Sequence, residues 1–73
     1  MLELLVGRRY ETLEQLKDDI ENITSQRVNS IIESESDKIE DLDYMIDFEF
    51  EESDIHTIFY LKDNGNRYYI TEV

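Results

Sequence analysis

Apolar and polar residues alternate along residues 43–51, and this is the clearest pattern in the chain. One face carries Tyr44, Ile46, Phe48 and Phe50, and the other carries Asp43, Asp47, Glu49 and Glu51. A period of two residues is typical of a β-strand that buries one face. The pattern therefore predicts a strand over residues 43–51.

Two further strands follow in the same half of the chain. Residues 55–62 are rich in β-branched and aromatic residues, which favour strands. Asn64 and Gly65 stand between them and residues 67–73, and Asn-Gly is a strong hairpin signal because a type I′ turn needs two residues with positive φ. With a first turn at Glu52 and Ser53, the three segments 43–51, 55–62 and 67–73 form an antiparallel meander.

Two-residue turns at both places fix the register of this meander. Ile46 then faces Phe59, and Phe59 faces Ile70. One face collects nine apolar side chains: Tyr44, Ile46, Phe48, Phe50, Ile55, Phe59, Leu61, Tyr68 and Ile70. Both turns lead to the same apolar face, which supports this register.

A helix precedes the meander. Thr12 and Gln15 have the spacing of a capping box, in which the threonine hydroxyl accepts from the backbone N–H three residues later. Apolar residues then recur at helical spacing, at Leu13, Leu16, Ile20 and Ile23. The pattern predicts a helix over about residues 12–24 that packs on the apolar face of the sheet.

Two segments permit more than one interpretation. Val28, Ile31 and Ile32 are consistent with a continuation of the helix, a second helix or a short strand, and we favour a helix that extends to about Ser34. Residues 1–9 are apolar at first and then basic, which is consistent with a short strand or an apolar lead-in to the helix, and we favour the strand. The expected class is a single α+β domain over residues 1–73.

Composition limits the functions that this domain can have. The chain has 73 residues, no cysteine and a net charge of −12, and eleven acidic residues lie between Glu33 and Asp54 against the single Lys38. This charge argues against direct binding of nucleic acid or anionic membranes and permits a basic protein partner. The apolar start of the chain is too short for a signal peptide, so we expect a cytoplasmic protein.

No catalytic or metal-binding pattern stands out. His56 is the only histidine, and the predicted register places it opposite Glu49 as a surface cross-strand pair. Asp37, Asp41 and Asp43 lack the spacing and the glycine of an EF-hand loop. We therefore expect neither an enzyme nor a protein with a metal or cofactor.

The second face of the sheet is the candidate interface. It carries Met45, Ile58, Tyr60, Tyr69 and Val73 within a polar border. A contiguous exposed apolar patch usually marks an interaction site, and the sequence predicts a homodimer through it, so that Tyr60→Glu yields a folded monomer. The alternatives are that Leu2, Leu4 and Val6 cover this face within one chain, or that a foreign partner covers it.

The acidic segment supports a second hypothesis. Seven carboxylates lie in or near the first strand of the meander: Asp37, Glu40, Asp41, Asp43, Asp47, Glu49 and Glu51. Such a row can imitate the phosphates of a nucleic acid and occupy a cationic groove. The alternative function is an acidic mimic that inhibits a DNA- or RNA-binding protein.

Two resemblances accompany these patterns. From Glu11 to Val73, the acidic, cysteine-free plan of a helix followed by three strands is similar to the YopT-type hypothetical proteins of Bacillus prophages, which implies a homodimeric phage or prophage accessory protein. The segment from Ile58 to Glu72, with its Asn-Gly turn, resembles a hairpin of acidic anti-CRISPR proteins that imitate DNA. The preferred function is accordingly a non-enzymatic phage-derived protein that acts through protein–protein contacts.

Overall fold

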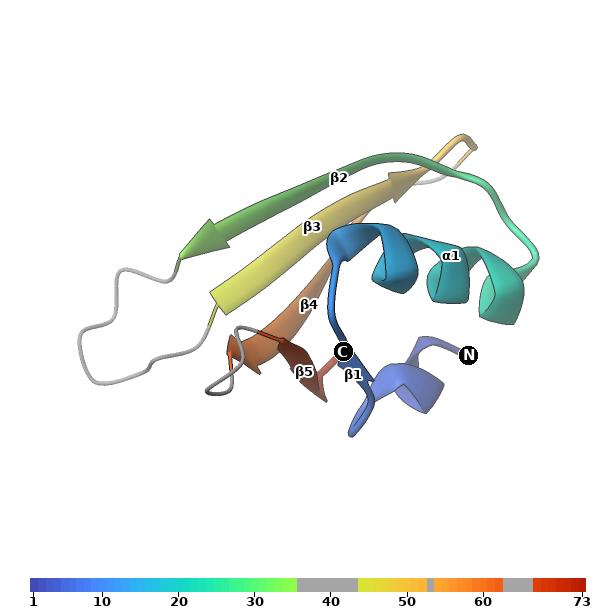
Figure 1. The fold of residues 1–73 in the computed structure, drawn as a ribbon. Helices are drawn as coiled ribbons and strands as arrows, with labels where there is room; N and C mark the ends of the chain where they lie inside the picture. Colours follow the sequence, from blue (N-terminus) through green and yellow to red (C-terminus); the bar gives the residue numbers. More distant parts are fainter. Residues whose placement is uncertain (36–43, 53, 63–66) are drawn as a thin grey trace.

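A single antiparallel sheet organises the computed structural model, which describes residues 1–35, 44–52, 54–62 and 67–73. The elements in chain order are η1 (Leu2–Leu5), β1 (Arg9–Tyr10), α1 (Leu13–Thr24), β2 (Val28–Glu35), β3 (Tyr44–Phe50), β4 (Ile55–Lys62) and β5 (Tyr68–Glu72). The strand order is β1-β5-β4-β3-β2 (Figure 1). The α+β class is confirmed, and the predicted meander of three strands gains one strand at each edge.

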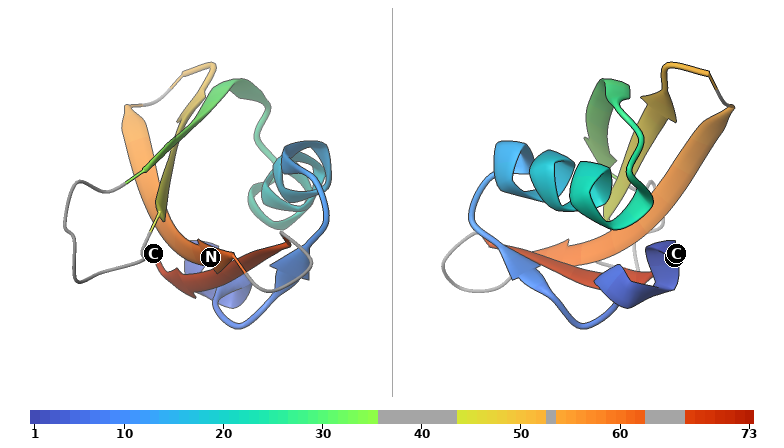
Figure 2. Two further views of the ribbon diagram at one scale, coloured as in Figure 1. Left: turned by 60° about the vertical axis from the view of Figure 1, so that its left-hand side comes forward. Right: turned by 90° about the vertical axis from the view of Figure 1, so that its right-hand side faces the viewer.

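The sheet is curled, and α1 lies on its concave side between the two edge strands β1 and β2 (Figure 2). The buried stripe of α1 consists of Leu16 and Ile20. These side chains meet a core contributed by all the strands and by η1, namely Leu5, Tyr10, Val28, Ile46, Phe48, Phe50, Ile58, Tyr60 and Ile70. The helix therefore closes the opening that the curled sheet leaves between its edges.

Local interactions fix both ends of α1. The Thr12 Oγ1 accepts a hydrogen bond from the Gln15 backbone N–H at 3.2 Å, and the Gln15 Oε1 accepts from the Glu11 N–H at 2.8 Å. The predicted N-terminal cap is thus confirmed. The helix ends at Thr24 because Ser25 adopts a left-handed conformation with φ of 56°.

The favoured extension of the helix to Ser34 is wrong. Val28–Glu35 is strand β2, which pairs with β3 along its length. The apolar stripe of α1 ends at Ile23, and the β-branched Val28, Ile31 and Ile32 suit a strand better than a helix. Of the three alternatives that the sequence permits here, the strand is the observed structure.

The cap allows a direct test of the helix start. We expect Thr12→Ala to lower the free energy of unfolding by about 1 kcal/mol, because the Gln15 N–H loses its acceptor. Urea denaturation followed by circular dichroism measures this change. Thr12→Ser keeps a hydroxyl acceptor and serves as the control. A loss of equal size in both variants would show that the threonine methyl, not the cap, carries the effect.

The first nine residues form no long strand. Leu2–Leu5 is a short 3₁₀ helix that packs against α1, and Leu5 is fully buried. The Gly7 N–H donates to the Ile70 carbonyl at 2.8 Å, with Gly7 at a φ of 88° that suits glycine. Only Arg9 and Tyr10 form strand β1, so the prediction of a strand over residues 1–9 is wrong in extent. The segment packs on the concave side and not across the outer face.

The register of β4 differs from the prediction by one residue against β3 and, from Tyr60 to Lys62, by one residue against β5. Ile46 faces Ile58, and Tyr60 faces Ile70. A shift of one residue turns every side chain of a strand to the opposite face. Ile58 and Tyr60 are therefore buried in the core, whereas the side chains predicted to be buried, Ile55, Phe59 and Leu61, lie on the outer face.

The lengths of the two connections explain this shift. Between the paired residues Glu49 and Ile55 lie the five residues 50–54, and between Lys62 and Tyr68 lie the five residues 63–67. Two-residue turns require an even number of residues between paired positions, so neither pairing is compatible with them. The proposed turn residues Ser53, Asn64 and Gly65 lie outside the described residues.

Candidate interaction surface

The convex face of the sheet carries a continuous strip of apolar side chains, which we call the outer strip. Its members are Ile32, Met45, Phe59, Leu61 and Tyr69. Met45 pairs with Phe59, and Leu61 pairs with Tyr69. Ile32 pairs with Asp47 and is thus a diagonal neighbour of Met45. The strip crosses from the edge strand β2 to β5.

The exposure of the strip is large for apolar side chains. Ile32 is 64% exposed and Phe59 is 37% exposed, and the other three members are half-buried. The Arg9 guanidinium lies over the Tyr69 ring at 4.6 Å from its centroid and closes the strip at the β1 edge. Aromatic residues, methionine and arginine are enriched at protein interfaces, and a guanidinium over an aromatic ring is a favourable contact.

The five residues predicted for this face divide into three groups. Met45 and Tyr69 lie on it as predicted. Ile58 and Tyr60 do not, because they are fully buried on the concave side, so their assignment to an exposed interface is wrong. Val73 is half-exposed and lines a cleft beside the N-terminus. Phe59 and Leu61 were missed because the predicted register placed them inside.

Carboxylates border the outer strip on β3. Asp47 accepts a hydrogen bond from the Thr57 hydroxyl at 2.6 Å, and Glu49 accepts one from the Asn29 amide at 3.1 Å. Glu51 is exposed in the turn that follows β3. The remaining members of the predicted acidic surface, Asp37, Glu40, Asp41 and Asp43, lie outside the described residues. The described part of that surface thus flanks the outer strip.

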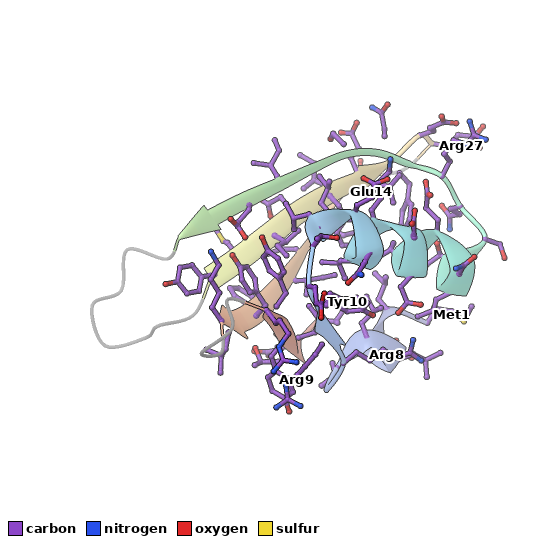
Figure 3. All side chains as sticks on the ribbon, viewed as in Figure 1. Met1, Arg8, Arg9, Tyr10, Glu14 and Arg27 are labelled. Carbon is purple, nitrogen blue, oxygen red and sulfur yellow. The ribbon has the colours of Figure 1, made fainter. Side chains whose placement is uncertain are left out.

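A second polar group joins β1 to the helix. The Tyr10 hydroxyl and the Arg8 guanidinium both donate to the Asp19 carboxylate on α1, the latter at 2.8 Å. Arg8 and Tyr10 are labelled in Figure 3. Burial and the hydrogen bond to Asp19 raise the pKa of Tyr10. The same carboxylate raises the pKa of Arg8. This group lines an open polar cleft and ties the edge strand to α1.

Three tyrosines and an ion pair form a cluster on the concave side, which we call the tyrosine cluster. The ring of Tyr60 stacks on Tyr44 with centroids 5.3 Å apart and contacts Tyr68 at 4.9 Å. The Tyr60 hydroxyl donates to the Glu33 carboxylate at 2.6 Å, and the Lys62 Nζ lies 3.9 Å from the same carboxylate. Sequence reasoning missed this cluster because it placed Tyr60 outside and residue 33 in a helix.

Contacts within the tyrosine cluster shift the pKa values of three of its members, Tyr60, Tyr68 and Glu33. Burial and then the Glu33 carboxylate raise the pKa of Tyr68 to about 12, and they raise that of Tyr60 as well. Burial acts to raise the pKa of Glu33, but the hydrogen bonds from Tyr60 and Tyr68 and the charge of Lys62 outweigh it and lower this pKa below 4.5. The carboxylate is therefore ionised at neutral pH, with protonated hydroxyls around it.

His56 lies on the concave side, opposite Phe48 and not opposite Glu49. Its ring stacks on Phe48 with centroids 5.6 Å apart and meets Phe50 edge-on. The predicted surface pair is thus wrong, because the register shift turns His56 inward together with the rest of β4. The histidine packs among aromatic rings, an arrangement that serves the core.

Two further properties concern the described residues only. Among residues 1–35, 44–52, 54–62 and 67–73, no group of three or more potential ligands is arranged to hold a metal ion. In the same part of the chain, no helix has the length and apolar character needed to cross a membrane.

Comparison with known proteins finds no relative of this chain. The chain matches no protein-family model, no curated protein and no solved structure at a significant level.

Proposed function

We propose that this protein is a non-enzymatic binding protein that acts through protein–protein contacts and forms a homodimer through the outer strip. The observation that supports this most directly is the continuity of Ile32, Met45, Phe59, Leu61 and Tyr69 across neighbouring strands. Contiguous exposed apolar surface is costly unless a partner covers it. Phage or prophage origin, which the resemblance implies, stays a prediction.

A second copy of the chain suits this surface for two reasons. A domain of 73 residues buries a small core, and dimerisation adds apolar burial that the monomer lacks. The strip also lies on one face, so a two-fold axis brings it against itself in an isologous contact. The net charge of −12 opposes the contact at low salt and is screened as salt is added.

Phe59→Glu tests the homodimer. We expect the native protein to show the mass of a dimer in multi-angle light scattering, and Phe59→Glu to show that of a monomer, because the new carboxylate stands unpaired in the middle of the strip. The native dimer should persist at high salt, since screening weakens the repulsion and leaves apolar burial intact.

Leu4→Glu is the matched control for this experiment. Leu4 is an exposed apolar residue of η1, which packs against α1 on the other side of the sheet. Leu4→Glu introduces the same negative charge as Phe59→Glu but outside the outer strip, so this variant should remain a dimer. A native protein that is monomeric over the whole concentration range would contradict the homodimer, as would a Phe59→Glu variant that remains dimeric.

The carboxylates beside the strip favour one alternative function. Asp47 and Glu49 occupy alternate positions on the outer face of β3, and Glu51 is exposed directly after this strand. This spacing supports an acidic mimic that inhibits a DNA- or RNA-binding protein by occupying its cationic groove. Such binding weakens steeply with added salt, whereas the apolar homodimer does not. Mass measurements of a mixture with a basic partner at low and high salt separate the two functions.

A further inference from the structure

The side chain of Lys62 occupies an aromatic site on the concave side of the sheet. Its Nζ lies 5.3 Å from the centroid of the Tyr44 ring and 5.8 Å from that of Tyr68. The Glu33 carboxylate stands 3.9 Å from the same ammonium group. Two aromatic faces and one carboxylate thus surround a single cation.

The walls of this site are held in place without help from Lys62. Tyr60 is fully buried and stands between the other two rings, stacked on Tyr44 and in contact with Tyr68. Its hydroxyl also fixes the Glu33 carboxylate at 2.6 Å. Residues from β2, β3, β4 and β5 meet here, so the sheet itself sets the geometry of the site.

Aromatic faces beside a carboxylate are the combination that recognises ammonium ions, because the ring quadrupole and the negative charge both attract a cation. We propose that Tyr44, Tyr68 and Glu33 form a binding site for an organic ammonium group, and that Lys62 fills this site as a tethered internal ligand. The net charge of −12 favours the approach of cations to the protein.

Lys62 holds the site weakly. A distance of 3.9 Å between its Nζ and the carboxylate exceeds that of a charge-assisted hydrogen bond, and the side chain remains 32% exposed. A ligand on a tether competes at an effective concentration that the length and stiffness of the tether set. An external ammonium group therefore competes with Lys62 in the native protein and binds without competition when Lys62 is removed.

Titration of Lys62→Ala with tetramethylammonium chloride tests the proposal. We expect saturable shifts of the Tyr44 and Tyr68 ring signals in NMR spectra, with a dissociation constant on the order of 10 mM from two cation–π contacts. The native protein should bind several-fold more weakly because Lys62 competes. A parallel titration with sodium chloride corrects for ionic strength. Shifts that fail to saturate, or that sodium reproduces, would overturn the site.

Lys17→Ala is the matched control, since it removes the same charge from α1 and leaves Lys62 in place. It should bind like the native protein, and binding equal to that of Lys62→Ala would reduce the effect to general electrostatic attraction. Tyr44→Leu in the Lys62→Ala background keeps an apolar side chain and removes the ring face. Binding that survives this change at full strength would also contradict the proposal.

A further comparison identifies the source of the ammonium group. Tetramethylammonium and choline represent small molecules, and a short peptide with one trimethyllysine represents a protein side chain. Peptide binding at least about tenfold tighter than that of tetramethylammonium, or about 1.4 kcal/mol, assigns the site to a protein partner. Equal affinities assign it to small organic cations. This site lies on the opposite face from the outer strip, so its test is independent of the homodimer.

Discussion

Tyr60→Glu is expected to unfold the protein. Tyr60 is fully buried, and loss of a large buried ring costs about 3–5 kcal/mol. The new carboxylate would also stand unpaired beside Glu33, which Tyr60 now supplies with a hydrogen bond. A domain of 73 residues has a free energy of unfolding of only roughly 4–11 kcal/mol. The combined loss is comparable to the whole stability, in contrast to the folded monomer that the sequence predicts for this variant.

Phe59→Glu, a change at the neighbouring residue, is the control for Tyr60→Glu. Phe59 lies on the outer face, so the same new charge remains in contact with water and the fold should survive. Far-ultraviolet circular dichroism and thermal unfolding at several protein concentrations measure both variants, which separates folding from self-association. If Tyr60→Glu were folded and Phe59→Glu unfolded, the observed register would be contradicted and the register predicted from two-residue turns would be supported.

Short-range sequence patterns predict the positions of most helices and strands in this chain. Strict alternation placed β3, and β-branched and aromatic composition placed β4 and β5 within a residue or two. The cap at Thr12 located the start of the helix. Each of these features depends on residues close in sequence, so the chain itself encodes them locally.

The register in which β4 pairs with β3 and β5 could not be predicted from the local sequence pattern, because β4 is apolar on both faces. Ile58 and Tyr60 alternate with Phe59 and Leu61, so either face of this strand satisfies an apolar core. Only the number of residues in each connection decides between them. The tyrosine cluster depends on the same choice, since it needs Tyr60 inside.

Strand β2 was missed for a different reason. Val28, Ile31 and Ile32 have a spacing that suits a helix, and the strand becomes evident only when β3 supplies its partner. Edge strands of this kind are stabilised by tertiary pairing, which overrides a weak local preference. The same misassignment hid Glu33, which reaches the tyrosine cluster only from a strand beside β3.

Alkaline pH is expected to unfold the protein through Tyr10 and Tyr60, which are buried, and Tyr68, which is partly buried. Tyr10, Tyr60 and Tyr68 have pKa values raised above 10 by burial first and then by the carboxylates of Asp19 and Glu33. A raised pKa in the folded state means that this state binds the proton more tightly than the unfolded chain does. The resulting stability is complete below pH 10 and is lost as the pH rises toward about 12, the pKa of folded Tyr68.

Circular dichroism and tyrosinate absorbance, recorded together between pH 8 and pH 12, measure this loss. We expect part of the absorbance change to coincide with unfolding, because these three hydroxyls ionise readily only when unfolding exposes them to water and separates them from the neighbouring carboxylates. Tyr68→Phe removes one ionisable group and should make stability fall less steeply above pH 10, relative to its own value at pH 8. Complete ionisation of all tyrosines while the circular dichroism spectrum remains native would show that the clusters around Asp19 and Glu33 do not contribute to the stability of the fold.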